Sequence, residues 1–261
     1  MLFLISPAKT LDYDTPLPAA LQRRATEPLF MDEAAALIEV LRDRSASEVA
    51  ALMDLSESLA TLNVSRYRAW QRSPAPEQVR PAVRAFNGDV YDGLQAASLT
   101  TADLNWAQQH LVILSGLYGV LRPLDRLQPY RLEMGTALAN PRGRDLYAFW
   151  GDRLAQWLDA QLEGTRPAVL VNLASVEYAR AALRPALQAR VVHCSFEDWK
   201  DGQYKIISFF AKRARGLYAR WAIQNRVRHV AQLARFEAEG YAFAPEASDT
   251  DRLVFRRRVA G

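Results

Sequence analysis

The sequence predicts a mixed α/β (α+β) fold, with one compact domain over residues 1–261 that contains a mixed sheet flanked by helices. Short apolar runs typical of buried strands occur at 1–5, 111–114 and 168–173. Segments with apolar residues at helical spacing separate these runs, and no internal repeat or clean linker divides the chain. Half of the 261 residues are apolar, which is enough to bury a large core.

In the N-terminal half, the strand at 1–5 leads into a proline-rich loop, SPAKTLDYDTPLP. Helical spacing predicts helices over 31–41 and 48–62, and Ser65 is a candidate cap for a further helix. Thr100 or Thr101 opens a helix that ends at His110, and the apolar strand 111–114 follows it directly.

In the C-terminal half, large apolar residues at i, i+3 and i+4 predict one amphipathic helix over 145–162. A strand at 168–173 and a helix at 176–187 follow. Asp201-Gly202 predicts a hairpin turn between two strands. These strands cover 191–196 and 204–210, and the remaining elements are a helix at 211–224 and a strand at 253–255.

Several classes of protein are disfavoured. The apolar runs are much shorter than the roughly 20 residues of a membrane span, and the N-terminus lacks the charge order of a secretory signal, so we expect a cytoplasmic protein. The single cysteine, Cys194, excludes an internal disulfide, and its apolar surroundings predict an inert buried thiol. No CxxC, HExxH, GxSxG or GxGxxG motif occurs, so we expect no metal and no cofactor, and direct iron sequestration is disfavoured.

Positive charge is concentrated in one segment. Residues 200–229 contain eight Lys or Arg residues and one acid, Asp201, although the whole chain carries only +4. On a helical wheel Lys212, Arg213, Arg215 and Arg220 fall opposite the apolar residues of the same helix. This pattern fits either a phosphate-binding stripe or an ordinary solvated face. The absence of any acid from 203 to 235 favours anion binding.

The loop after the first strand is a second candidate site. Ser6-Pro7-Ala8-Lys9 places a hydroxyl and an ammonium three residues apart, which suits an anion site or a serine activated by lysine. The alternative is that the serine and proline end the strand while Lys9 is solvated.

Residues 115–135, SGLYGVLRPLDRLQPYRLEMG, form the most distinctive pattern in the chain. The pattern of tyrosines, glycine, prolines and aspartate is similar to short segments of proteins that handle modified nucleosides. Asp125, with Tyr118, Tyr130 and Arg131, could hold a flipped base, and Arg122 could extend the cationic surface. The alternative is a rigid wide turn whose aromatic residues pack.

Six blocks together resemble the bacterial peroxide stress protein YaaA family: LISPAKTLDY, FNGDVYDGL, SGLYGVLRPLDRLQPYRLEMG, DLYAFWGD, VNLASVEY and YKIISFFAKRARGLYARW. The resemblance runs from residue 2 to about residue 258. It implies a cytoplasmic protein of the hydroperoxide response that limits iron-linked damage. It also implies DNA binding on a family-specific fold with a helix-hairpin-helix element beside a basic cleft, and it supplies no catalytic reaction.

Two placements of the helix-hairpin-helix are open. One uses the helices around Leu62-Asn63-Val64, and the other uses helices on either side of Gly116-Leu117-Tyr118-Gly119. The second offers glycines at which backbone can approach a phosphate closely. The EDWKDGQ turn departs from the family pattern, so Lys200 is the weaker candidate among the lysines.

Two functions follow. The first is binding to the backbone of double-stranded DNA with low sequence specificity and no obligate protein partner, through Lys9, Arg122, Arg131, Lys205, Lys212, Arg213, Arg215 and Arg220. The second is an enzyme acting on a nucleoside, nucleotide or damaged base, with Ser6, Lys9, Asp125 and Tyr118 lining one pocket. The second hypothesis requires the N-terminal loop and residues 115–135 to meet in space.

Overall fold

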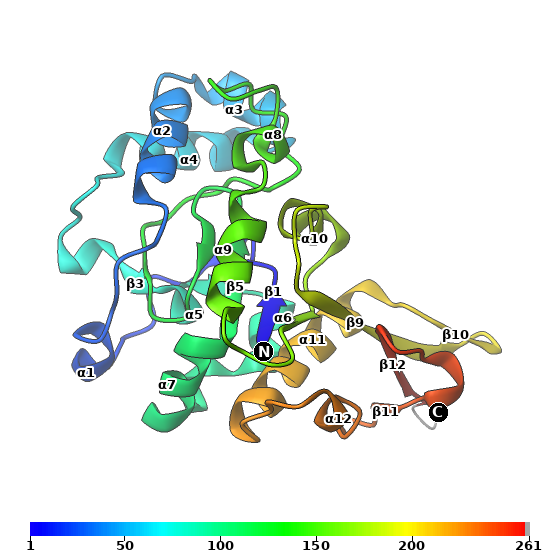
Figure 1. Ribbon diagram of the computed structural model, residues 1–261. Helices are drawn as coiled ribbons and strands as arrows, with labels where there is room; N and C mark the ends of the chain where they lie inside the picture. The colour runs from blue at the N-terminus through cyan, green and yellow to red at the C-terminus, as the bar shows by residue number, and fades with distance from the viewer. Residues whose placement is uncertain (259–261) are drawn as a thin grey trace.

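The fold is built on a central eight-stranded sheet. A computed structural model describes residues 1–258, so the last three residues of the expected domain lie outside the described residues. The strand order is β11-β12-β9-β8-β1-β5-β6, with β10 paired to β9 (Figure 1). The strands are β1 Leu2–Ile5, β5 Leu111–Ser115, β6 Gly119–Leu121, β8 Val169–Asn172, β9 Arg190–Lys200, β10 Gln203–Lys205, β11 Ala242–Phe243 and β12 Arg252–Arg257.

The sheet is mostly parallel. β5, β1, β8, β9 and β12 all run in the same direction, whereas β6, β10 and β11 pair antiparallel at its margins. Every residue of β1, β5 and β8 is buried, as expected for parallel strands covered on both faces. The prediction of a mixed α/β fold around a mixed sheet is therefore confirmed.

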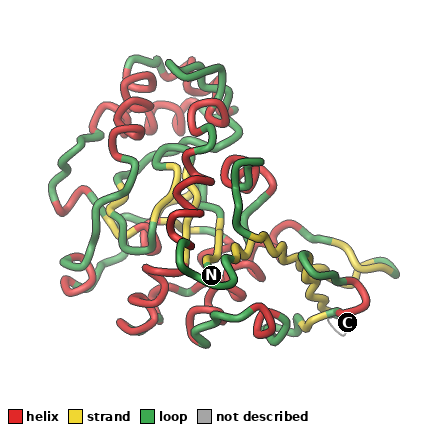
Figure 2. The backbone as a smooth tube through the Cα atoms, viewed as in Figure 1, coloured by secondary structure: helices red, strands yellow, loops and turns green. Residues whose placement is uncertain are grey.

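Helices surround the part of the sheet around β1 and β5, whereas Figure 1 and Figure 2 show β9, β10, β11 and β12 extending together to one side. The longest helix, α11, packs against α6, β9 and β1. The helices are α1 Ala19–Gln22, α2 Met31–Arg42, α3 Ala46–Met53, α4 Glu57–Ala69, α5 Ala82–Ala85, α6 Asp89–Leu94, α7 Thr101–His110, α8 Leu146–Trp150, α9 Arg153–Leu162, α10 Val176–Ala182, α11 Ser208–Gln224 and α12 Val230–Leu233. Two small ladders complete the fold and pair β2 Thr10–Leu11 with β4 Phe86–Asn87, and β3 Arg80–Pro81 with β7 Arg126–Leu127.

Many predicted elements are confirmed, including the strands at 1–5, 111–114, 168–173 and 253–255 and the helices at 31–41, 101–110 and 211–224. Thr100 caps α7 through a capping box with Asp103. The hairpin turn at Asp201-Gly202 is also confirmed, since both residues have positive φ. Its second strand is shorter than predicted, because β10 ends at Lys205 and α11 already begins at Ser208.

Two predicted helices are each split in two. The helix at 48–62 is interrupted at Asp54, which has a φ of 50°, and Ser56 then caps α4. The helix at 145–162 is interrupted at Gly151, which has a φ of 52°. The helix predicted to reach residue 187 ends at Ala182, ahead of Pro185.

Both placements of the helix-hairpin-helix are wrong. Leu62-Asn63-Val64 lies inside α4, where Asn63 donates to the Leu59 carbonyl at 2.8 Å, and Ser65 is an internal residue of the same helix. The segment from Gly116 to Gly119 connects two strands, β5 and β6, and not two helices.

Candidate functional site

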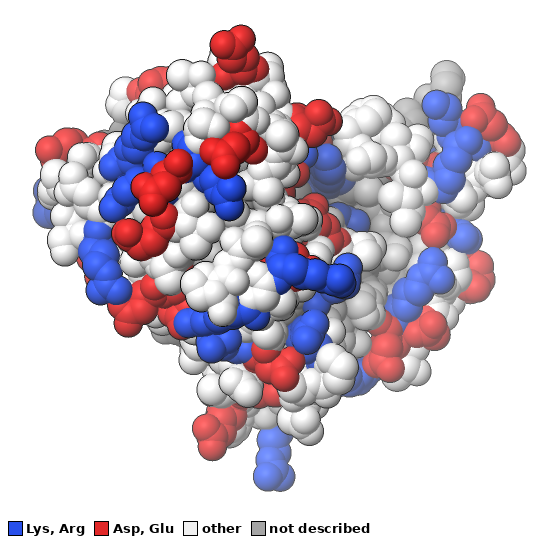
Figure 3. All heavy atoms as spheres, turned by 90° about the horizontal axis from the view of Figure 1, so that it is seen from above, with Lys and Arg blue, Asp and Glu red and all other residues white. Residues whose placement is uncertain are grey.

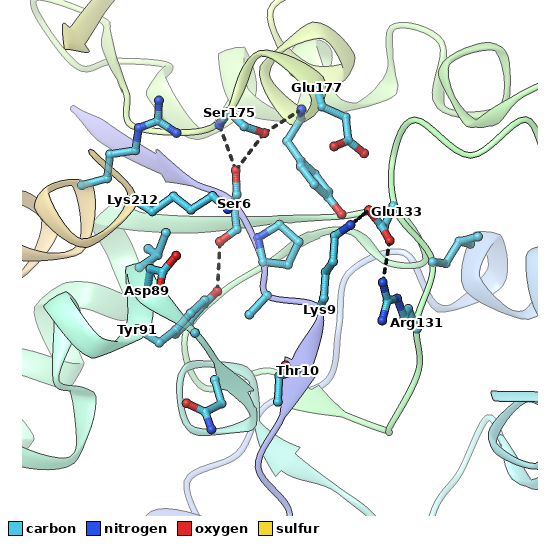
Figure 4. A pocket seen from close by; sticks show the side chains of 18 of the residues that line it. Ser6, Lys9, Thr10, Asp89, Tyr91, Arg131, Glu133, Ser175, Glu177 and Lys212 are labelled. Atoms are coloured by element: carbon cyan, nitrogen blue, oxygen red, sulfur yellow. Dashed lines mark hydrogen bonds and ion pairs between the residues drawn. The ribbon is translucent and has the colours of Figure 1, made fainter. Parts of the chain in front are cut away.

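A pocket of about 350 Å³ opens at the carboxyl ends of β1 and β8 (Figure 4). Four chain segments and one helix line it, and they come from distant parts of the sequence. These are residues 6–10 after β1, 87–91 at the start of α6, 130–133, 175–178 after β8, and Lys212 and Arg215 of α11.

The sheet topology explains this location. The chain leaves β1 toward its neighbour β5 on one side, and leaves β8 toward β9 on the other side. β1 and β8 are themselves adjacent and parallel, so the two connections diverge between them. In open α/β sheets such a point of divergence leaves a crevice at the carboxyl ends of the strands, where ligands bind.

Two serines join the strands at the floor of this crevice. The Ser175 backbone N–H donates to Ser6 Oγ at 2.9 Å, and Ser6 Oγ donates to Ser175 Oγ at 3.3 Å. Ser175 Oγ also accepts from the Tyr178 N–H at 3.5 Å, as the N-cap of α10. The Ser175 hydroxyl donates no hydrogen bond to any group among residues 1–258, so its proton is available to a ligand.

One part of the pocket is an ion cluster around Glu133. Lys9 Nζ lies 2.5 Å from Glu133 Oε2, and Arg131 Nη2 lies 3.1 Å from Glu133 Oε1 (Figure 4). Arg131 Nε is buried and has no hydrogen-bond partner within residues 1–258. One carboxylate thus pairs with two cations, which leaves this cluster with a net charge of +1.

The other part contains two cations that are not neutralised. Lys212 and Arg215 are three residues apart on α11 and therefore lie on one face of the helix. Within residues 1–258 neither side chain makes an ion pair or a hydrogen bond. Burial lowers the pKa of the Arg215 guanidinium, which nevertheless stays charged at neutral pH. Figure 4 shows Lys212 reaching toward Ser6.

Tyrosine rings complete the walls. The Tyr91 hydroxyl donates to the Ser6 carbonyl at 3.2 Å, and Tyr130 and Tyr178 also line the pocket. Burial raises the pKa of all three hydroxyls, so they remain protonated and act as hydrogen-bond donors rather than bases.

The whole chain resembles proteins of one family. Residues 1–247 match the family described as "Peroxide stress protein YaaA". This chain belongs to the peroxide stress protein YaaA family. It is 62% identical over 260 residues to a UPF0246 protein of Leptothrix cholodnii, with 100% of both chains covered. It is 58% identical to the UPF0246 protein of Bordetella petrii, with 99% of this chain and 100% of the relative covered, and 59% identical to that of Paracidovorax citrulli, with 100% of both covered.

The pocket of this YaaA-family chain contains only part of the predicted catalytic set. Ser6 and Lys9 line it, whereas Asp125 and Tyr118 do not. Asp125 is fully buried elsewhere, where it accepts from the Arg122 N–H at 2.7 Å, from Thr26 Oγ1 at 2.6 Å and from the Arg122 guanidinium at 2.9 Å. Burial raises the pKa of this carboxyl, against the effect of Arg122.

Tyr118 is likewise a core residue. Its hydroxyl accepts from Trp70 Nε1 at 2.9 Å, and burial raises the pKa of that hydroxyl to about 12. The enzyme hypothesis required Asp125 and Tyr118 beside Lys9, and the structure does not assemble that group. Around Asp125 the stretch 115–135 forms a largely buried turn between β6 and β7. The stretch reaches the pocket only through Tyr130, Arg131, Leu132 and Glu133.

Most of the predicted DNA-contacting cations are engaged with other protein groups. Arg213 pairs with Glu239, with Nε and Oε2 2.9 Å apart, and Lys205 pairs with Asp201 at 2.7 Å. Arg220 donates to the carbonyls of Leu94 and Gln95 at the end of α6, and Arg122 pairs with Asp125. The helical wheel missed these pairings because most of the partners come from other segments of the chain.

Sequence reasoning missed several pocket residues, among them Asp89, Glu133, Ser175 and Glu177. One signal for Ser175 was present in the sequence. It follows the buried strand 168–173 just as Ser6 follows the strand 1–5, and the carboxyl ends of parallel strands meet at one edge of a sheet.

Two further features bear on function. Among residues 1–258, no three His, Cys, Asp or Glu side chains are grouped so that they could hold a metal ion. In the same range, no helix has the length and apolar character needed to cross a membrane.

Proposed function

We propose that this chain, as a single domain over residues 1–261, is a cytoplasmic DNA-binding protein of the oxidative stress response. In this proposal it contacts the phosphate backbone with low sequence specificity and limits iron-linked damage during hydroperoxide stress. The oxidative stress role rests on the YaaA family, and DNA binding is our own extension of it. The helix-hairpin-helix-like element would be the α3–α4 pair, whose helices pack against each other across residues 54–56.

The observation that carries the proposal is the pair of unneutralised cations on α11. Lys212 and Arg215 lie at the edge of the sheet where ligands of open α/β folds bind, and no carboxylate within residues 1–258 pairs with either. Cations without a carboxylate partner in the protein are suited to bind phosphate, because they can replace the mobile counter-ions of the nucleic acid. Such backbone contacts do not depend on the base sequence.

The surface around this pocket fits the proposal. Figure 3 views the molecule from above, which is the side toward which β1 points in Figure 1. It shows Lys and Arg side chains around and within a hollow of the surface, with Asp and Glu among them. The basic character is therefore local, and it depends on which cations lack a partner rather than on the total charge.

Binding of a short fluorescein-labelled duplex, followed by fluorescence anisotropy, tests the proposal. In the wild type, log affinity should fall linearly with log salt between about 50 and 200 mM. The double variant Lys212→Glu/Arg215→Glu should bind the duplex much more weakly at every salt concentration and show a smaller slope, because phosphate contacts are lost.

The matched control is Arg23→Glu/Arg235→Glu, which changes the net charge equally on exposed residues. These residues follow α1 and α12, at the lower end of the view in Figure 1, away from the carboxyl ends of the strands. The control should keep most of the affinity. Equal loss in both double variants, or unchanged affinity in Lys212→Glu/Arg215→Glu, would contradict the proposed site.

A further inference from the structure

We propose that the pocket between β1, β8 and α11 binds a terminal phosphate monoester, carried by a nucleoside monophosphate or by the phosphorylated end of a DNA strand. An internal phosphate of an intact duplex would reach only its rim. This inference rests on the proposed function, because it names the ligand class of the same site. Size, charge and the arrangement of donors carry it.

The size of the pocket limits what can enter. Its volume of about 350 Å³ lies at the lower end of the roughly 300–1,000 Å³ range of small-molecule sites. A duplex, whose major groove alone is about 12 Å wide, can only lie across the opening. The Arg215 side chain is only partly exposed and lines this pocket. A phosphate that reaches Arg215 must therefore end a chain or belong to a free nucleotide.

Four cations and three carboxylates line the pocket, and the two cations that have no carboxylate partner favour a dianion. Lys212 and Arg215 together present two positive charges that no carboxylate within residues 1–258 neutralises. A terminal phosphate monoester carries about −1.5 to −2 near neutral pH, whereas an internal phosphodiester carries one negative charge. The terminal group therefore matches the two free cations, and the diester matches only one.

The hydrogen-bond donors are complementary to a phosphate. Arg215 offers a planar fork, Lys212 offers a mobile ammonium, and the Ser175 hydroxyl has a proton with no acceptor among residues 1–258. Ser6 holds Ser175 from the neighbouring strand, through the Ser175 N–H at 2.9 Å, so this donor is fixed before a ligand arrives.

The rest of the pocket suits a nucleoside and disfavours additional phosphates. Tyr91, Tyr130 and Tyr178 line the pocket and are 7%, 4% and 8% exposed, so they offer a base a small aromatic contact. Asp89 and Glu177 are acceptors for ribose hydroxyls, in the way that carboxylates bind ribose in dinucleotide sites. The same carboxylates repel a β- or γ-phosphate, so a nucleoside monophosphate should bind more tightly than a di- or triphosphate.

Isothermal titration calorimetry with AMP, adenosine and ATP tests the ligand class. AMP should bind at least about tenfold more tightly than adenosine, since the terminal phosphate makes charge-assisted hydrogen bonds. It should also bind more tightly than ATP. Arg215→Gln should weaken AMP binding by about tenfold or more and leave adenosine binding unchanged. Arg235→Gln is the control and should bind AMP like the wild type.

Competition with DNA separates the two carriers of the phosphate. The competitors are duplexes with 5′-phosphorylated ends, the same duplexes with 5′-hydroxyl ends, and a closed dumbbell duplex without ends. A preference for phosphorylated ends that disappears in Arg215→Gln assigns the site to strand ends, and AMP binding without such a preference assigns it to free nucleotides. Lys212→Gln serves as a second variant if Arg215→Gln does not fold by circular dichroism.

The two proposals fail in different ways. One outcome is that the dumbbell binds with salt dependence while a terminal phosphate changes neither nucleotide binding nor binding of strand ends. This outcome overturns the inference and leaves the proposed function intact. AMP binding without binding of any DNA overturns the proposed function alone. Equal affinity for AMP and adenosine in both the wild type and Arg215→Gln also overturns the inference.

Discussion

Replacing Gly216 by alanine should both destabilise the protein and weaken the phosphate site, because Gly216 is where α11 touches α6. A Cβ at this position would lie 1.8 Å from the Val90 carbonyl oxygen and 2.8 Å from the Leu94 nitrogen. The contact is reciprocal, since a Cβ on Gly93 of α6 would lie 2.2 Å from the Arg213 carbonyl oxygen. The obstacles are backbone atoms, so no side-chain rotation can relieve the clash.

The size of the effect follows from the required displacement. Close carbon–oxygen contacts lie at about 3.3 Å, so the two helices must separate by about 1.5 Å to accept the methyl group. Overpacking of this kind costs about 1–3 kcal/mol, and the better helix propensity of alanine returns up to about 1 kcal/mol. Because both surfaces are backbone, we expect the upper end of the range, with a net loss of about 2 kcal/mol.

The same displacement affects the site. Lys212 lies one turn before Gly216 and Arg215 is adjacent to it, so a shift of α11 moves both cations relative to Ser6 and Ser175. Misplacement of a binding group by about 1 Å can cost orders of magnitude where geometry is demanding. We expect AMP affinity to fall about tenfold or more.

Urea unfolding followed by tryptophan fluorescence measures the stability, and calorimetry measures AMP binding. Gly164→Ala is the control, because a Cβ there meets nothing within 4 Å. Its φ of +75° costs about 1–2 kcal/mol for the left-handed conformation, and AMP affinity should not change. A Gly216→Ala protein with wild-type stability and wild-type AMP affinity would refute the idea that α6–α11 contact positions the site.

The remaining predictions concern three single side chains. Asp125→Ala should lower the free energy of unfolding by about 3 kcal/mol, because it leaves the half-buried Arg122 without its carboxylate partner. Urea denaturation measures this, and unchanged stability would argue against a structural role for Asp125. Burial raises the pKa of the Cys194 thiol to about 12, so native protein should resist iodoacetamide at pH 8 and react once unfolded. In the unfolded chain the Cys194 thiol ionises near pH 8.5, whereas in the folded protein it stays protonated to higher pH. Its contribution to the free energy of unfolding should therefore be complete below about pH 8.5 and be lost as the pH rises toward 12. Unfolding measured across this pH range, with Cys194→Ala as the comparison, checks the sign. Glu133→Gln should tighten AMP binding severalfold, measured by calorimetry, because it removes the negative charge that pairs with Lys9 and Arg131. Weaker binding would show that the ion cluster organises the pocket instead.

The sequence alone was sufficient for the α/β class, for most strands and helices, for the buried cysteine and for the family. These properties depend on local patterns. Continuous apolar runs of a few residues identify buried parallel strands, and apolar residues at a spacing of three and four identify helices. The errors were also local in origin, since Asp54 and Gly151 each break a helical pattern through a positive φ that the apolar spacing does not reveal.

The candidate site depended on tertiary structure. Ser6 and Ser175 are 169 residues apart and meet because β1 and β8 are adjacent parallel strands. Asp125 is conspicuous in the sequence, yet burial beside Arg122 gives it a structural role. Among the lysines and arginines of the basic segment, only the fold decides which ones find a carboxylate or carbonyl partner and which remain free to bind an anion. Side-chain type is encoded locally, but electrostatic neutralisation acts through space between residues that the chain path brings together.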